Sequence, residues 1–106
     1  MPDVAVVIGN YQGEAVLEDC LASLETQTLR PTEVIVVDAD STDASAAAAA
    51  AFGASFLRRE NRGLGYLYNE GARAATAPYV MLVNNDVALD SRCLERLHHQ
   101  GDHPGR

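Results

Sequence analysis

The chain has 106 residues, 47% of them hydrophobic and 22% charged, which predicts one small globular domain whose apolar runs are too short to cross a bilayer. Its 15 acidic residues against 8 basic ones give a formal net charge of −7, which argues against non-specific nucleic-acid binding because that depends on Lys and Arg at the phosphates. Two cysteines without metal-ligand spacing, and no evident signal peptide, make the cytoplasm the default location.

The first half of the chain predicts two strands and two helices in alternation. Residues 4–8 ("VAVVI") and 34–37 ("VIVV") are short β-branched runs, typical of strands that are buried on both faces. Between them an amphipathic helix is predicted to end near residue 27, from apolar residues at helical spacing: Val16, Leu17, Cys20, Leu21 and Leu24. Six alanines at 46–51 predict a second helix, which Gly53 closes.

The second half continues the alternation. Residues 54–57 ("ASFL") predict a third, weaker strand, and residues 77–83 ("APYVMLV") predict a fourth. The helix between them is predicted from Leu64, Leu67, Tyr68, Ala72 and Ala75. A last helix that contains Leu94 and Leu97 is expected to be capped by Asp90 or Ser91. We interpret the histidine-containing C-terminal stretch as a frayed or cut end rather than a metal site.

The alternation of strands and helices predicts a three-layer α/β fold with a Rossmann-like, mostly parallel sheet, formed by residues 1–106 as one domain. In such a sheet, ligands bind beyond the carboxyl ends of the strands. Four polar loops, one after each predicted strand, fall at this edge: "GNYQGE", "DADSTD", "RRENRG" and "NND". Their common position predicts a binding site there.

Two of these loops carry carboxylates suited to a ligand. Asp38 directly follows a buried strand, where it can accept a hydrogen bond from a ribose hydroxyl or a base N–H, and we favour ligand contact over a role in the turn. Asp43 is expected to cap the second helix instead. At residues 84–86 ("NND"), a carboxylate with neighbouring amide oxygens suits a hard divalent ion that keeps bonds to substrate phosphates. An Asx turn explains these three residues equally well.

A nicotinamide-type Rossmann domain is an alternative for this order of elements. The glycine pattern G-x-G-x-x-G is absent, and the first loop offers only Gly9 and Gly13. Without the remaining glycines, the following helix cannot approach a pyrophosphate closely. The dinucleotide interpretation therefore stays a minor alternative.

Three segments together resemble the amino-terminal half of the family-two inverting glycosyltransferases, which have the glycosyltransferase-A fold. They are "VAVVIGNYQGEAVLEDCLASLETQT", "EVIVVDADSTD" and "ENRGLGYLYNEGARAATAPYVMLVNND", in the family's order. The resemblance implies transfer of a sugar from a UDP-, dTDP- or GDP-linked donor to a glycan or lipid-linked acceptor, with inversion and with Mg²⁺ or Mn²⁺. It also suggests the rhamnosyltransferase-like branch, polysaccharide biosynthesis and a place peripheral to the inner face of the membrane.

The resemblance implies roles for particular residues. Tyr11 would pack on the base, Asp38 would begin the nucleotide loop, and Asp40 would stand in for an acid that is Ala39 here. Asp86 matches the last acid of the family's D-x-D type motif and is the implied metal ligand. The full set implied to bind the nucleotide sugar is Gly9, Asn10, Tyr11, Asp38, Asp40, Asn61, Gly63, Asn69 and Asn85.

The sequence also departs from the family. Gly9 replaces its usual Pro, Tyr68 replaces an Arg, and the metal motif keeps one acid of two. The family's acceptor-binding half, with its catalytic base, would follow residue 106, so we expect a truncated donor-binding half without a catalytic residue of its own. A non-catalytic nucleotide-binding module of the same fold is the alternative. An uncovered sheet edge is expected to favour homo-oligomers.

Overall fold

The computed structural model describes residues 3–96, which form seven elements in strict alternation of strand and helix. In chain order they are β1 (Val4–Asn10), α1 (Glu14–Glu25), β2 (Glu33–Asp38), α2 (Ser45–Phe52), β3 (Ser55–Arg58), α3 (Leu64–Ala74) and β4 (Tyr79–Asn84). Residues 93–96 add a helical turn, while Leu97 and the histidine-containing end lie outside the described residues. The predicted order is confirmed, and element boundaries differ from the predicted ones by one or two residues.

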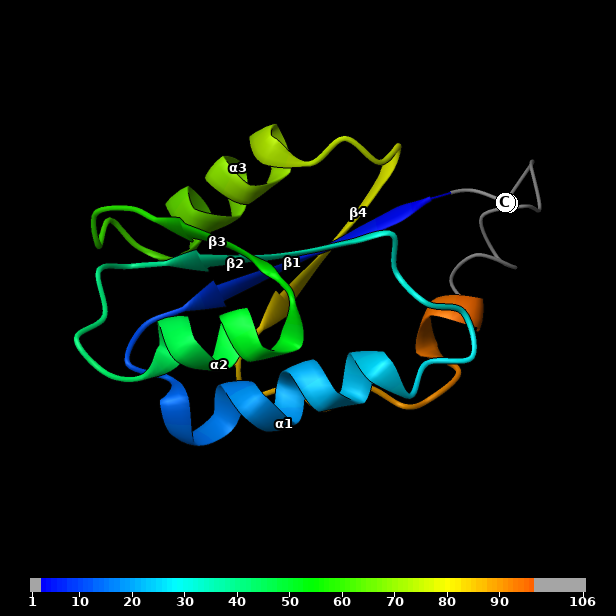
Figure 1. Ribbon diagram of the computed structural model, residues 1–106. Helices are drawn as coiled ribbons and strands as arrows, with labels where there is room; N and C mark the ends of the chain where they lie inside the picture. Colours follow the sequence, from blue (N-terminus) through cyan, green and yellow to red (C-terminus); the bar gives the residue numbers. More distant parts are fainter. Residues whose placement is uncertain (1–2, 97–106) are drawn as a thin grey trace.

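The four strands form one all-parallel sheet in the order β3-β2-β1-β4. Helices α1 and α2 cover one face of this sheet and α3 covers the other, which confirms the predicted three-layer α/β fold (Figure 1). β1 has β2 on one side and β4 on the other, so the direction of winding reverses at β1. In register, Asn10 is paired with Asp38, and Gly9 with Asn84. The loops that follow these three strands therefore begin side by side.

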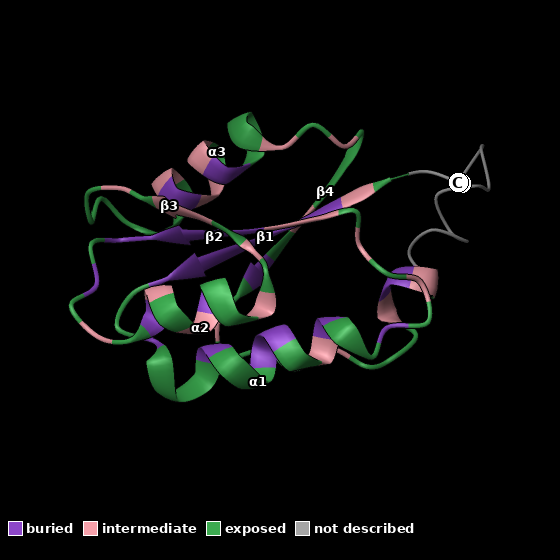
Figure 2. Ribbon diagram, in the orientation of Figure 1, coloured by how far each residue is buried: buried purple, intermediate pink, exposed green. Residues whose placement is uncertain are grey.

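The core lies on both faces of β1, as the β-branched run predicts (Figure 2). Successive side chains of a strand point to opposite faces. Val6 and Ile8 therefore pack with the apolar residues of α1, whereas Val7 packs with Leu67 of α3. Cys20 is buried in the first of these clusters, as expected, and burial together with the Asp86 charge raises the pKa of its thiol to about 11.

β4 is an edge strand and differs from the buried strand that its apolar run indicates. Tyr79, Val80 and Leu82 are 51%, 39% and 48% exposed, because β4 lies at the edge of the sheet and α3 packs on β1 and β2 instead. Among the described residues, no helix is both long enough and apolar enough to span a membrane.

The alanine-rich helix α2 ends as the sequence predicts, but its first residues differ from the predicted cap. Gly53 adopts a left-handed conformation with φ of 91°, and its N–H bonds to carbonyls of the last turn. At the start of the helix, the N-cap residue is Ala44, which makes no side-chain cap hydrogen bond. Asp43 lies one residue earlier, and its Oδ1 accepts the Ser45 N–H at 3.0 Å. The predicted end at Gly53 is confirmed, whereas the prediction that Asp43 is the cap residue is wrong by one position.

Replacement of Ser45 by Ala is expected to leave the stability unchanged or to raise it. The Ser45 side chain is fully buried, and its Oγ has no hydrogen-bond partner among the described residues. An unpaired buried hydroxyl costs about 1–3 kcal/mol, which alanine removes while it also favours the helix. Urea unfolding of Ser45→Ala checks this, and a loss above about 1 kcal/mol would show that the hydroxyl has a partner.

Candidate functional site

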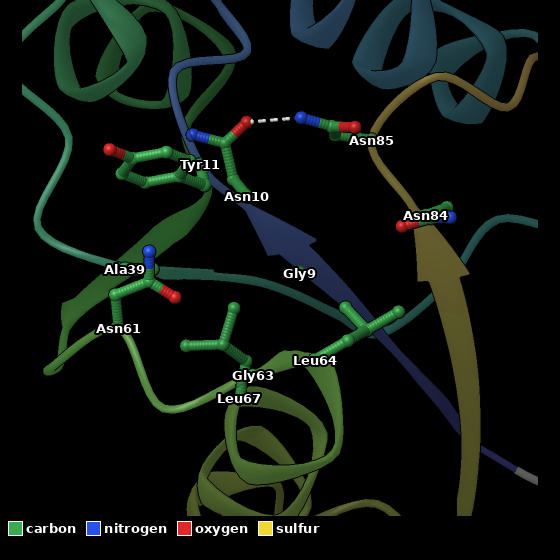
Figure 3. Close-up of a pocket in the computed structure, with 10 residues that line it drawn as sticks. All are labelled: Gly9, Asn10, Tyr11, Ala39, Asn61, Gly63, Leu64, Leu67, Asn84 and Asn85. Carbon is green, nitrogen blue, oxygen red and sulfur yellow. Dashed lines mark hydrogen bonds between the residues drawn. The ribbon is translucent and has the colours of Figure 1, made fainter.

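An open pocket of about 240 Å³ lies at the carboxyl edge of the sheet, beside the point where the winding reverses at β1. One side of it comes from the loop before α3 and from the first turns of that helix, and the other comes from the ends of β1 and β4 (Figure 3). Its lining residues are Gly9, Asn10, Tyr11, Ala39, Asn61, Gly63, Leu64, Leu67, Asn84 and Asn85. Six of the predicted nucleotide-sugar residues thus meet in one place: Gly9, Asn10, Tyr11, Asn61, Gly63 and Asn85.

Four predicted site residues lie outside this lining. Asp40 is exposed, has a φ of 57° and forms an ion pair with Arg58 at 3.7 Å. Asn69 is exposed on α3, and Asp86 is exposed in the turn after β4. Asp38 is fully buried at the end of β2.

The carboxylate of Asp38 is enclosed by protein donors. It accepts hydrogen bonds from the Asn10 side-chain amide at 2.8 Å, from the Ser41 N–H at 2.7 Å and from the Ser41 hydroxyl at 2.6 Å. An ionised carboxylate acts only as an acceptor, so these three donors satisfy much of its capacity. The structure thus gives Asp38 the internal role of fixing the loop after β2, whereas ligand contact stays a prediction.

A second set of hydrogen bonds ties the loop after β1 to the same segment. The N–H of Gln12 donates to the Ser41 hydroxyl at 2.7 Å, and its side-chain oxygen accepts the Thr42 N–H at 2.8 Å. The Glu14 N–H donates to the Oδ2 of Asp43 at 3.0 Å. These bonds hold together the two loops above β1 and β2. The sequence alone gave no signal for Gln12 beyond its place in a polar loop.

The "NND" segment forms a turn that the backbone closes. The N–H of Val87 bonds to the Asn84 carbonyl at 3.2 Å, so the turn does not require an Asx side chain. The Asn85 amide donates to the Asn10 side-chain oxygen at 2.8 Å (Figure 3). Within residues 3–96, the Asp86 carboxylate has no hydrogen-bond or ion-pair partner, and this leaves it available to a ligand.

The fit of a divalent ion depends on how many oxygens the protein supplies. No group of three His, Cys, Asp or Glu side chains in the described part of the chain could enclose a metal. Mg²⁺ is commonly held by one or two carboxylates together with substrate phosphates, so the single free carboxylate of Asp86 fits an ion that arrives with a diphosphate. Asp86 would hold such an ion.

Among the described residues, neither the pocket lining nor the arginines of the adjoining loop offer a free positive charge to a ligand. None of the described lining residues is charged. The arginines of the adjoining loop are engaged elsewhere: Arg59 binds Glu70 at 2.8 Å, and Arg62 lies over the Tyr66 ring at 4.6 Å. A diphosphate in this pocket would therefore need a cation or backbone N–H groups to balance its charge.

Gly9 and Tyr68, two departures from the family pattern, lie close together, and Gly9 lines the pocket. A Cβ at Gly9 would lie 2.5 Å from the Leu64 Cδ1 and 3.5 Å from the Tyr68 Cε1. The absence of a side chain at Gly9 thus makes room for Leu64, which lines the pocket and is 41% exposed. Sequence reasoning placed Leu64 and Leu67 on a helix but missed them as lining residues, because helical spacing does not show which turn faces a ligand.

Nucleotide-binding α/β proteins share this arrangement. They have a parallel sheet with a pocket beyond the carboxyl ends of its strands, beside the point where the direction of winding reverses. The sequence model of the family described as glycosyl transferase family 2 matches residues 5–104. The chain belongs to this family, as the resemblance predicted.

Curated relatives agree with this assignment. The chain is 30% identical over 107 residues to EpsH of Bacillus subtilis (strain 168), a protein assigned as a glycosyltransferase, and the match covers 95% of this chain and 31% of EpsH. It is 31% identical over 100 residues to the glycosyltransferase GlyA of Streptococcus pneumoniae serotype 4, and here the match covers 90% of this chain and 14% of GlyA. The chain thus spans less than a third of the length of these relatives.

Solved structures share the fold. S. aureus TarS 1-349 in complex with UDP superposes with a TM-score of 0.81 at 23% identity, over 92% of this chain and 31% of that one. The mannosyltransferase PcManGT of Pyrobaculum calidifontis, in complex with GDP-Man and Mn²⁺, gives a TM-score of 0.83 at 24% identity, over 98% of this chain and 35% of that one. The predicted glycosyltransferase-A type fold is confirmed.

Proposed function

We propose that this chain is the donor-binding part of an enzyme that transfers a sugar from a nucleotide-diphosphate sugar to an acceptor hydroxyl, with inversion and with Mg²⁺ or Mn²⁺. The observation that carries the proposal is the pocket beside β1. Six residues that family resemblance alone assigned to the donor, from three separate segments of the chain, line this single pocket. The bound UDP, GDP-Man and Mn²⁺ of the two structural neighbours support the class of ligand.

The pocket offers distinct surfaces to the parts of such a donor. The Tyr11 ring is 54% exposed at its rim, and aromatic rings of this kind stack on nucleobases. On the opposite side, α3 begins at Leu64 after Gly63, which makes no side-chain cap. The first N–H groups of a helix have no partners within the helix and favour an anion, so this end suits the diphosphate.

Inversion requires the acceptor hydroxyl to attack the anomeric carbon opposite the leaving diphosphate, while a general base takes the proton. The lining offers amides, glycines, apolar side chains and one tyrosine, and we propose that the base comes from residues other than these. Asp86 would hold the metal ion, which when bound neutralises charge on the leaving diphosphate. The described residues thus bind and orient the donor.

The finer features that the resemblance implies also belong to this proposal. They are a rhamnosyl or related donor, a glycan or lipid-linked acceptor, a role in polysaccharide biosynthesis, and a cytoplasmic place peripheral to the membrane. Self-association through β4 is a further prediction, because the free edge of β4 exposes Tyr79 and Leu82.

A non-catalytic nucleotide-binding module is the second candidate. The observation that favours it is the lack of acids among the described residues of the pocket lining: Ala39 lines the pocket where the family often has an acid, and Asp86 lies outside the lining. Such a module would bind the nucleotide in the same way but would not turn the donor over.

A thermal-shift titration with UDP, dTDP and GDP, each with and without Mn²⁺, tests the proposed donor site. We expect one nucleotide to stabilise the protein in a metal-dependent manner, by about 2.7 kcal/mol at a hundredfold excess over its dissociation constant. Asp86→Ala is expected to abolish the metal-dependent part of the shift. Asp19→Ala, an exposed carboxylate on α1, is the matched control and is expected to keep it.

The possible results separate the candidates. A cooperative melt without any nucleotide shift would contradict a working donor site in this protein. Stabilisation by NAD that is indifferent to metal would favour the nicotinamide alternative. Binding without sugar transfer by the intact protein would favour the non-catalytic module.

A further inference from the structure

Asn10 lies at the centre of a hydrogen-bond chain that joins the ends of three strands. It is 1% exposed. Its Nδ2 donates to the Asp38 Oδ1 at 2.8 Å. Its Oδ1 accepts the Asn85 Nδ2 at 2.8 Å, the bond drawn in Figure 3. Both ends of the Asn10 amide are therefore used inside the protein, although its backbone position places it in the pocket lining.

The chain of bonds has a fixed direction. Asp38 receives three donors and acts as an acceptor, so Asn10 must turn its NH₂ group toward it. The oxygen of Asn10 then faces residue 85, which must be a donor. The amide of Asn85 meets this requirement, and a carboxylate in its place would not. Because Asp38 fixes the orientation of the Asn10 amide, the side chain at residue 85 has to be a hydrogen-bond donor.

The glycine at residue 13 provides a separate observation on the same contact. Its φ of −100° is open to any residue, so backbone conformation does not require glycine here. A Cβ at Gly13 would instead collide with the Asn85 Nδ2 and the Asn10 Oδ1, the two atoms of the hydrogen bond. Gly13 is buried, and its missing side chain leaves the space in which this bond forms.

We propose that Asn10 is a positioning residue for the turn that carries Asp86, the proposed metal ligand. In this proposal the Asn10 side chain does not bind the donor. Through Asn85 it holds the turn that carries Asp86 in a fixed place relative to the loop that begins at Asp38. The loop that begins at Asp38 and the carboxylate of Asp86 are thereby held in a fixed relative position before a ligand binds. This lowers the free-energy cost of ordering them on binding. This inference rests on the proposed donor site.

The test compares nucleotide affinity with and without Mn²⁺ in the intact protein, by calorimetric titration of the nucleotide that gives the largest thermal shift. Asn85→Ala removes the donor, and Gly13→Ala inserts a methyl group between the partners. Gly13 lies outside the pocket lining, so Gly13→Ala is expected to keep the metal-free dissociation constant within about twofold. Both variants are expected to reduce the gain from Mn²⁺ by roughly three- to tenfold, as the loss of one hydrogen bond does. Asp19→Ala, at an exposed residue of α1 outside the pocket lining, is the control.

A second readout does not depend on any ligand. The Val87 N–H bonds to the Asn84 carbonyl within the turn that carries Asp86. Its hydrogen exchange is expected to accelerate in Asn85→Ala and Gly13→Ala, but not in Asp19→Ala. This would show directly that the bond between residues 10 and 85 holds the turn.

The outcomes distinguish this inference from the function on which it rests. If Asp86→Ala loses the gain from Mn²⁺ while Asn85→Ala and Gly13→Ala keep it together with slow exchange, the positioning role is overturned and the donor site stands. If both variants lose metal-free affinity by the same factor, the bond shapes the nucleoside pocket, and the positioning role is again overturned. If the wild-type protein binds no nucleotide, the proposed function fails and the inference fails with it.

Discussion

Replacement of Asp38 by Ala is expected to destabilise the folded domain by about 3–4 kcal/mol, measured by urea unfolding without any ligand. The carboxylate is fully buried and accepts three hydrogen bonds. Its removal leaves the Asn10 amide and the Ser41 N–H without an acceptor, and each unsatisfied buried donor costs about 1–3 kcal/mol. Asp38→Asn is expected to fall between the wild type and Ala, because its amide keeps one oxygen but turns an NH₂ group toward another donor.

The neighbouring acid in the same loop provides the control. Asp40 is exposed, and its ion pair with Arg58 spans 3.7 Å between two exposed side chains. Such pairs contribute little, so Asp40→Asn is expected to change the stability by less than about 0.5 kcal/mol. If Asp38→Ala unfolded at the same urea concentration as the wild type, its carboxylate would not be tied into the fold, and direct ligand contact would become its main role.

Replacement of Gly71 by Ala is expected to reduce the stability by about 1–3 kcal/mol. This glycine lies where α3 packs on the sheet, and a Cβ would collide with the Val7 Cγ1 and lie 2.9 Å from the Val37 Cγ2. Both valines belong to the central strands and cannot move without disturbing the core. Helix propensity alone predicts the opposite sign, since alanine is favoured over glycine within a helix by about 0.5–1 kcal/mol.

The same helix contains the matched control for this prediction. Gly65 has open space where a Cβ would stand, so Gly65→Ala is expected to raise the stability by about 0.5–1 kcal/mol. Thermal or urea unfolding of the two variants side by side separates packing from propensity. Equal stabilities for Gly65→Ala and Gly71→Ala would mean that α3 does not approach the sheet as closely as the structure shows.

The sequence predicts the fold well because its strongest patterns are local. The β-branched run at 4–8 specifies a buried strand, and the alanine run followed by Gly53 specifies a helix and its end, whatever the rest of the chain does. The sequence is less informative for β4. The apolar run at 80–83 is typical of a buried strand, although Leu82 is 48% exposed. Burial at that strand depends on what covers the sheet edge, and this is not encoded in the run itself.

For the candidate site, the sequence by itself determined the edge of the sheet, because parallel strands bring the loops that follow them to one side. It also supplied, by resemblance, six of the residues that line the pocket. Only the tertiary structure decided that Asp38 faces inward while Asp86 stays free, and that Asn10 meets Asn85 across 75 positions of sequence. The direction of a side chain and its partner depend on the register of β1 against β2 and β4. That register is set by the packing of the whole sheet and not by any segment alone.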